Sequence, residues 1–247
     1  MPTADRFFIK DGYVPRPQPR SLDPTDQTRY WTDERIAAST YWQHDVYRLA
    51  RRLLQVRRPA TILDFGCGSG LKAKQQLGDL GELLLVDQAN AERIVERLWP
   101  GTAFRPMDLE APTPLDRRFD LIVCADVIEH LADPTPCLRF IAEQLADDGL
   151  ALVSTPERDL VRGVENTEPT HPEHVREWNA DELQALMTHC GLAVDRIELL
   201  PQHRLSAAET ALRRIVPSRW RHGLVGRRWT GCQTAVCRRA ASAGPAS

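Results

Sequence analysis

The sequence predicts an α/β fold in which helices cover both faces of a doubly wound parallel sheet. Between residues 61 and 155, short apolar segments of strand length alternate with helical segments, and this alternation is typical of parallel sheets. The apolar segment 61–65 runs directly into a turn with glycine at every second position from 66 to 70. A second apolar segment, 83–87, follows and also ends in an acid. Both features are typical of nucleotide-binding α/β domains.

The elements are expected in a regular order along the chain. Residues 1–30 hold several prolines among charged residues and predict an extended arm. From residue 32 to 56, apolar residues recur at helical spacing, which predicts a helix that ends before Pro59. Strands are then expected at 61–65, 82–87, 102–106, 119–125 and 149–155, and helices at 70–79, 90–97 and 134–146.

The last third of the chain is expected to begin with a loop at 156–176, before a helix at 178–190. Asn179, followed three residues later by Glu182, forms a capping-box pattern, and Gly191 ends the helix. A strand at 192–199, a helix near 206–216 and a last strand near 232–238 complete the chain. We therefore expect one domain over 36–240, with an arm at 1–35 before it and a flexible tail at 241–247.

Composition and charge exclude several classes of protein. The chain has 247 residues, of which 42% are hydrophobic and 27% charged, so it can bury a sizeable core. Its net charge of −2 does not favour nucleic acid or an anionic membrane as a partner, and no apolar run has the roughly 20 residues that span a bilayer. Arginines gather late and most simply form a solvated face: positions 213, 214, 219, 221, 227, 228, 238 and 239.

The six cysteines form no Cys-x-x-Cys pair. This pattern indicates a reducing environment without a zinc site, and we expect the protein to be cytoplasmic.

The glycine-rich turn reads Asp64-Phe-Gly-Cys-Gly-Ser-Gly70. Glycines at such a turn let the backbone lie against a ligand, and an acid at the end of the next strand, here Asp87, accepts hydrogen bonds from a ribose diol. A hydride-transfer fingerprint would set a pyrophosphate at this turn, but the charge of Asp64 would repel it. An acid there suits a nucleoside that carries an amino group and a sulfonium.

The turn resembles motif I of the class I S-adenosylmethionine (SAM) methyltransferases. The resemblance implies a Rossmann-like, doubly wound, seven-stranded sheet, mostly parallel with the last strand antiparallel, and SAM as the cofactor. It implies that Asp108 and Leu109 hold the adenine and that Ala125 and Asp126 flank the methionine moiety. The N-terminal helical stretch, with Trp31, Tyr41 and Trp42, is expected to close over the cofactor as a lid, although core packing is the commoner fate of such aromatics. The full set of expected cofactor residues is Asp64, Gly66, Cys67, Gly68, Gly70, Asp87, Gln88, Asp108, Leu109, Ala125 and Asp126.

Ionisable residues after the fourth strand are the candidates for methyl-transfer chemistry. If 126–130 form a helical turn, Asp126, Glu129 and His130 share one side of it, and the loop after the fifth strand adds His171 and His174. A hydroxyl acceptor needs a general base or a metal that lowers its pKa. Two interpretations follow. Either His130 is the base and the acids, Glu129 among them, are structural, or Asp126 or Glu129, together with His130 and His174, holds a divalent cation such as Mg²⁺ or Mn²⁺.

Further resemblances concern the methyl acceptor. Glu129-His130 with a later His174-x-x-Glu-Trp178 resembles small-RNA 3′-terminal 2′-O-methyltransferases, which bind Mg²⁺ with Glu-x-x-Glu-His and a distant His; Asp126 stands where that pattern has its first Glu. Ubiquinone-biosynthesis O-methyltransferases share the Glu-His pair. Ser154-Thr-Pro-Glu-Arg-Asp159 is similar to the loop of methyltransferases that act on sugar hydroxyls.

These resemblances imply methyl transfer to a hydroxyl of a saccharide or glycosylated metabolite, so the expected partner is a small-molecule or glycan substrate. RNA 2′-O-methylation, O-methylation of a quinone-like small molecule and non-catalytic SAM binding are the alternatives, and an NAD-dependent oxidoreductase is a more distant one. The sequence leaves the oligomeric state open.

Overall fold

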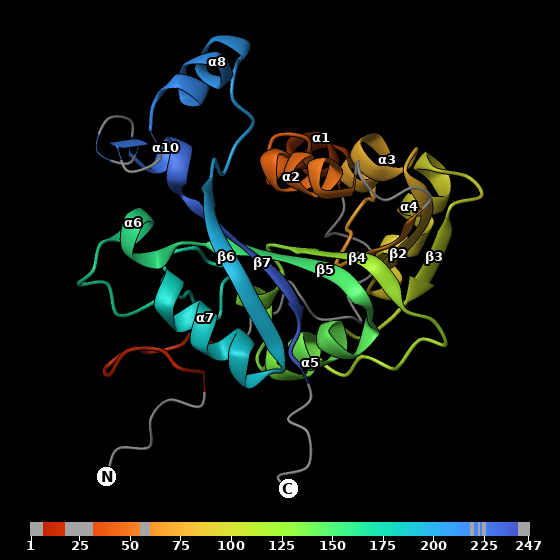
Figure 1. The fold of residues 1–247 in the computed structure, drawn as a ribbon, viewed down its shortest axis with the longest axis horizontal. Helices are drawn as coiled ribbons and strands as arrows, with labels where there is room; N and C mark the ends of the chain where they lie inside the picture. The colour runs from red at the N-terminus through yellow and green to blue at the C-terminus, as the bar shows by residue number, and fades with distance from the viewer. Residues whose placement is uncertain are drawn as a thin grey trace, which may run out of the picture.

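A single seven-stranded sheet organises the molecule (Figure 1). The computed structural model describes residues 7–17, 32–54, 60–217, 220, 221, 223 and 226–241. The strand order is β3-β2-β1-β4-β5-β7-β6. The pairs among β1 to β5 are parallel, whereas β7 lies antiparallel between β5 and β6. The strands are β1 (Ala60–Phe65), β2 (Gly81–Asp87), β3 (Ala103–Pro106), β4 (Phe119–Ala125), β5 (Leu145–Pro156), β6 (Leu192–Leu200) and β7 (Cys232–Arg239). The predicted seven-stranded sheet with an antiparallel last strand is confirmed.

Helices cover both faces of the sheet, as predicted (Figure 1). Buried residues of α2, α3 and α4 share one apolar cluster with β1, and buried residues of α5 and α7 share a second cluster on the other face. The described helices are α1 (Asp33–Ser39), α2 (His44–Leu54), α3 (Leu71–Leu77), η2 (Ala89–Ala91), α4 (Glu92–Leu98), η3 (Ile128–His130), α5 (Thr135–Gln144), α6 (Arg158–Arg162), α7 (Ala180–His189), α8 (Ala207–Ile215) and α10 (Arg227–Thr230).

The helix predicted at 32–56 is wrong as a single element, because the chain leaves the helical path between α1 and α2. Gln43 has a positive φ of 50°, and its amide donates to the Gln202 carbonyl over 3.2 Å. Trp42 forms a β-bridge with His203. These long-range backbone bonds replace the intrahelical ones, and apolar periodicity carries no sign of them.

The loop predicted at 156–176 is also corrected, since it contains the short helix α6. Glu157 caps this helix by accepting from the Leu160 amide over 2.5 Å. By contrast, the predicted start of α7 is confirmed, because Asn179 and Glu182 form a reciprocal capping box. The predicted arm, 1–35, is described at residues 7–17, which contain no helix or strand, and at residues 32–35, where α1 begins. Trp31 and most of the predicted tail lie outside the described residues.

Two further features bear on the predictions from composition. All six cysteines are buried and free. Within the described part of the chain, no helix is both long enough and apolar enough to cross a membrane.

Candidate functional site

A cavity of about 590 Å³ opens at the carboxyl ends of the central strands. The strand order reverses between β1 and β4, and ligands of open α/β sheets bind at this switch point. The cavity collects most of the predicted cofactor residues: Gly66, Cys67, Gly68, Asp87, Gln88, Leu109, Ala125 and Asp126. Asp64 and Gly70 are buried outside its lining, and Asp108 is exposed. Most of the predicted cofactor residues thus lie at one cavity, and their contact with a cofactor stays a prediction.

The loop after β1 requires its glycines for two reasons. Gly66, Gly68 and Gly70 all have positive φ values, of 83°, 57° and 69°, which side chains other than glycine adopt at a cost. A Cβ on Gly66 would also lie 2.3 Å from a Val127 methyl, and one on Gly70 would lie 2.6 Å from a Leu85 methyl. The loop is therefore packed too closely for any side chain, and its backbone borders the cavity.

Asp87, at the end of β2, holds the glycine loop in place. One carboxylate oxygen accepts from the Gly68 amide over 2.6 Å, and the other accepts from the Gln88 amide over 2.7 Å. Burial raises the pKa of Asp87 to about 6, while the two amides oppose that rise. Each carboxylate oxygen keeps acceptor capacity, so the side chain can also receive a ribose diol from the cavity.

Asp64 lies beneath the same loop and is only partly satisfied. One oxygen accepts from the Tyr47 hydroxyl over 2.9 Å, whereas the other has no hydrogen-bond partner in the described structure. Burial raises the pKa of Asp64 to about 7, and Tyr47 and Lys72 oppose the rise. An incompletely paired buried carboxylate favours a cationic ligand nearby, as the charge of a sulfonium nucleoside would provide.

The two residues predicted to hold the adenine are placed differently. Leu109 is buried and lines the cavity. Asp108 is exposed and accepts from the Glu110 amide over 2.9 Å, which is the geometry of an aspartate that stabilises a turn. An adenine contact for Asp108 stays a prediction.

A chain of polar side chains lines the cavity, and sequence analysis missed two of its members, Lys72 and Gln43. Lys72, on α3, donates to the Gln43 side-chain oxygen over 2.8 Å. The Gln43 side-chain amide donates to one carboxylate oxygen of Asp126 over 2.6 Å, and the Ser154 hydroxyl donates to the other over 2.8 Å. Burial lowers the pKa of Lys72. The helices here were predicted from their apolar residues. No pattern in the nearby sequence therefore identified Gln43, Tyr47 or Lys72 as cavity residues.

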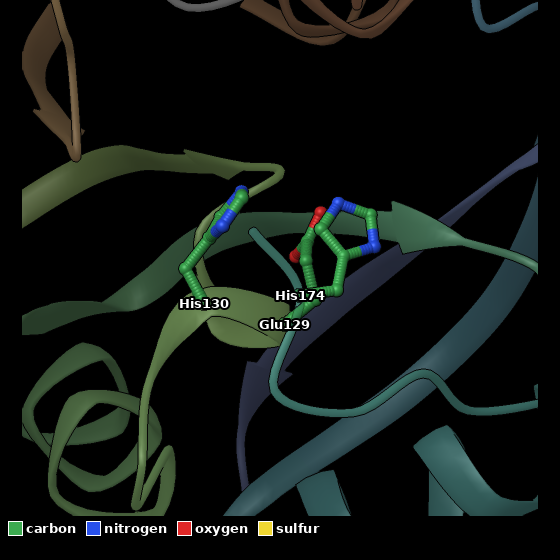
Figure 2. Close-up of side chains that lie close together, drawn as sticks. All are labelled: Glu129, His130 and His174. Carbon is green, nitrogen blue, oxygen red and sulfur yellow. The ribbon is translucent and has the colours of Figure 1, made fainter. Parts of the chain in front are cut away.

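Three predicted metal ligands lie close together (Figure 2) and line the cavity. Glu129 and His130 lie on η3 after β4, and His174 comes from the loop between α6 and α7. One potential ligand atom from each residue lies within 4.8 Å of the others. Glu129 is fully buried, and neither of its carboxylate oxygens has a hydrogen-bond partner among the described residues. Buried carboxylates of this kind are unfavourable unless a cation or a proton satisfies them.

The neighbours of both histidines fix which ring nitrogen is free. His130 Nδ1 lies 2.8 Å from the Glu173 carbonyl oxygen, and His174 Nδ1 lies 2.6 Å from a Glu177 carboxylate oxygen. Both oxygens are acceptors, so each Nδ1 carries a proton, and Nε2 is the ring nitrogen that these contacts leave for a ligand. Metal-binding histidines are oriented in this way by an acceptor on the opposite nitrogen.

The charges around the cluster favour the same protonation states. Burial, followed by the neighbouring His174, lowers the pKa of His130 to about 4, so its ring is neutral at pH 7. Burial opposes ionisation of Glu177, but hydrogen bonds from His174 and Arg162 lower its pKa to about 2. Burial, followed by the charge of Asp126, raises the pKa of Glu129. The cluster thus offers a neutral imidazole on His130 and a carboxyl group on Glu129 that ionises readily only beside a cation.

Asp126 is not among the three clustered ligands. The helical turn begins at Ile128, not at residue 126, and Asp126 has a positive φ of 52°. Its carboxylate is occupied by Gln43 and Ser154. Asp126 is therefore held by Gln43 and Ser154 and does not belong to the Glu129/His130/His174 group, so the geometry does not support its predicted role as a metal ligand.

Comparison with known proteins identifies the family. The chain belongs to the methyltransferase-domain family, whose sequence model matches residues 36–197, and the predicted membership of the class I SAM-dependent methyltransferases is confirmed. A protein of Mycobacterium tuberculosis named as a probable S-adenosylmethionine-dependent methyltransferase is 33% identical over 174 residues, which cover 70% of this chain and 59% of the relative. A ubiquinone biosynthesis O-methyltransferase of Ruegeria is 30% identical over 151 residues, which cover 55% of this chain and 61% of the relative. The chain thus spans about three fifths of these relatives.

Solved structures support the same fold. One is a chain from the complex between the Haloferax volcanii Trm112 methyltransferase activator and a methyltransferase. It has a TM-score of 0.68 and 17% sequence identity, and the match covers 89% of this chain and 98% of that one. Burkholderia thailandensis 1,6-didemethyltoxoflavin-N1-methyltransferase, solved with its substrate and S-adenosylhomocysteine, has a TM-score of 0.61 at 16% identity and covers 93% of this chain and 95% of its own length.

Proposed function

We propose that this protein transfers a methyl group from SAM to a hydroxyl oxygen with the help of a divalent cation. The observation that carries the proposal is that one cavity holds both the glycine loop with Asp87 and the cluster of Glu129, His130 and His174. Methyl transfer is an in-line displacement, and an enzyme promotes it by aligning donor and acceptor. A cavity with the two sets of groups at opposite sides provides that alignment.

The cofactor side would be held by the glycine loop and its neighbours. Asp87 is placed for the ribose diol, and Asp64 with its unpaired oxygen offsets positive charge on the donor. Lys72, whose ammonium reaches the same part of the cavity, would pair with the carboxylate of the methionine moiety. The three side chains would thus suit three parts of one ligand, namely its ribose, its positive charge and its carboxylate.

The acceptor side would be held by the Glu129/His130/His174 cluster. A divalent cation bound there would lower the pKa of an acceptor hydroxyl and hold its oxygen beside the sulfonium. Two imidazoles and one carboxylate suit a first-row ion such as Mn²⁺ at least as well as Mg²⁺. The alternative in which His130 alone is the base is weaker, because a pKa of about 4 is poorly matched to a hydroxyl.

The proposal of a saccharide acceptor is based on a residue at the mouth of the cavity. Trp42 lines the cavity and is 42% exposed, and its ring centroid lies 4.2 Å from that of His203. An exposed indole at a cavity mouth provides a flat apolar surface for a sugar ring. A quinone-like acceptor could use the same surface, and the named activity of the Ruegeria relative supports it as the second candidate.

Chelation tests the cation directly. We expect turnover with a panel of sugar and quinol acceptors to fall at least about 10²-fold after exhaustive treatment with a chelator, and to return on addition of Mn²⁺ or Mg²⁺. Binding of S-adenosylhomocysteine, measured by calorimetry, should be unchanged by the same treatment. Full turnover after chelation would refute the cation and return His130 to the role of base.

Cofactor affinity is expected to depend on pH because Asp64 has a pKa of about 7 in the empty protein. A positively charged donor favours the ionised carboxylate, so SAM binding must displace a proton when the pH is below that value. Affinity should therefore be about tenfold weaker at pH 6 than at pH 8. Calorimetry in buffers of different ionisation enthalpy should detect the released proton. An Asp64→Asn variant should bind more weakly and with a flatter pH profile, whereas a wild-type affinity that does not change with pH would contradict this assignment.

A further inference from the structure

Residues 7–17, which we call the N-terminal strap, pack beside α7 and the loop between α6 and α7 (Figure 1). They lie outside the residues that match the family, which begin at position 36. Ile9 and Tyr13 of the strap are buried in the apolar cluster on that face of the sheet. The strap is therefore docked on the domain by its own side chains.

The strap binds the ends of the α6–α7 loop. Its Val14 amide donates to the Thr167 carbonyl over 2.7 Å. The buried Tyr13 hydroxyl accepts from the Glu177 amide over 3.0 Å, and burial raises the pKa of Tyr13 to about 12, so the hydroxyl stays neutral. The Glu177 side chain orients His174, so Tyr13 holds the residue that orients a cluster histidine.

Arg16 of the strap binds the middle of the same loop. Its backbone amide donates to the Val175 carbonyl over 2.8 Å. Its guanidinium donates to the carbonyls of His171 and Pro169 over 2.7 and 2.8 Å. These three bonds hold the loop on both sides of His174, and charged donors to carbonyl groups are among the stronger hydrogen bonds.

The loop in turn holds the rest of the cluster. The Glu173 carbonyl accepts from His130, and the Val175 amide donates to the Glu129 carbonyl over 2.7 Å. By contrast, the glycine loop on the cofactor side is held by β2, since the Gly66 and Cys67 amides both donate to the Val86 carbonyl. The two sides of the cavity therefore have separate supports.

We propose that the N-terminal strap positions the α6–α7 loop, so that Glu129, His130 and His174 bind a divalent cation only while the strap is docked. This inference rests on the proposed function. Arg16 and Tyr13 are positioning residues, because they act through backbone groups of the loop and touch no ligand atom of the cluster. The strap thus governs the acceptor side of the cavity and leaves the cofactor side independent.

The test uses the full-length protein with the double substitution Tyr13→Phe and Arg16→Ala. We expect Mn²⁺ affinity, measured by electron paramagnetic resonance, to weaken at least about tenfold, while S-adenosylhomocysteine affinity stays within about twofold. Val14→Ala is the matched control, because this side chain is 63% exposed and its backbone bond to Thr167 is retained. Equal losses of both affinities in the double variant, or an unchanged Mn²⁺ affinity, would overturn the proposal.

A second measurement separates this inference from the proposed function. Hydrogen–deuterium exchange of residues 163–178 should accelerate in the double variant and not in Val14→Ala. If the wild-type protein binds no divalent cation, the cation assignment fails, and the inference about cation binding fails with it. Faster exchange would then still establish that the strap positions the loop, and unchanged exchange would remove the strap's positioning role as well.

Discussion

Replacing Glu129 by Gln is expected to abolish divalent-cation binding and to reduce turnover at least about 10²-fold, which corresponds to roughly 2.7 kcal/mol in the barrier. The amide keeps the shape of the buried side chain but removes the charge that a cation requires. Because neither carboxylate oxygen of Glu129 has a hydrogen-bond partner among the described residues, the substitution breaks no hydrogen bond of the side chain. The protein should therefore fold, and calorimetry should find its SAM affinity close to that of the wild type.

Glu143→Gln provides the control for this substitution, since Glu143 is exposed on α5. It should leave cation affinity, SAM affinity and turnover unchanged. Normal turnover in Glu129→Gln would contradict the role of the cluster in catalysis. Lost turnover with intact Mn²⁺ affinity would instead show that Glu129 acts in some way other than as a ligand.

Replacing Asp87 by Ala is expected to weaken SAM binding at least about 10²-fold, or roughly 2.7 kcal/mol. The change removes the proposed acceptor of the ribose diol, and it also leaves the Gly68 and Gln88 amides without their partner. The glycine loop would then lose one of its anchors. Titration calorimetry with S-adenosylhomocysteine gives the affinity, and circular dichroism shows whether the fold is retained.

Asp79→Ala is the matched control for Asp87→Ala. Asp79 is a surface carboxylate that pairs with Arg51, and surface pairs of this kind contribute little to stability. Its removal should not alter cofactor affinity. If Asp87→Ala bound the nucleoside as tightly as Asp79→Ala, the proposed cofactor site would have to be abandoned.

The strand ends of the site could be predicted because their signals are local. Gly66 and Gly70 stand where the backbone has a positive φ and no room for a Cβ, and Asp87 ends an apolar run as a strand-end acid should. The grouping of Glu129 and His130 with the distant His174 was one of two interpretations of the ionisable residues that follow the fourth and fifth strands, and a resemblance supported it. The capping box at Asn179 is read directly from two residues three apart.

The remaining features depend on contacts between residues far apart in the chain, which periodicity does not encode. The break at Gln43 is stabilised by a bond to Gln202, and the docking of Tyr13 depends on Glu177. Asp126 also bonds to a residue far away in the chain, Gln43. This bond occupies the carboxylate that was predicted to bind a metal together with the histidines. In each case tertiary bonds override what the local sequence favours.

The chain of bonds from Lys72 through Gln43 to Asp126 has a consequence for traffic through the enzyme. Lys72, Gln43 and Asp126 all line the cavity, and Lys72 and Asp126 are the residues expected beside the methionine moiety, so an entering donor would compete with Gln43 for both side chains. The bonds of Gln43 would break when the donor binds and re-form when the used donor leaves. The rates of donor entry and release would therefore depend on how easily the junction between α1 and α2 moves.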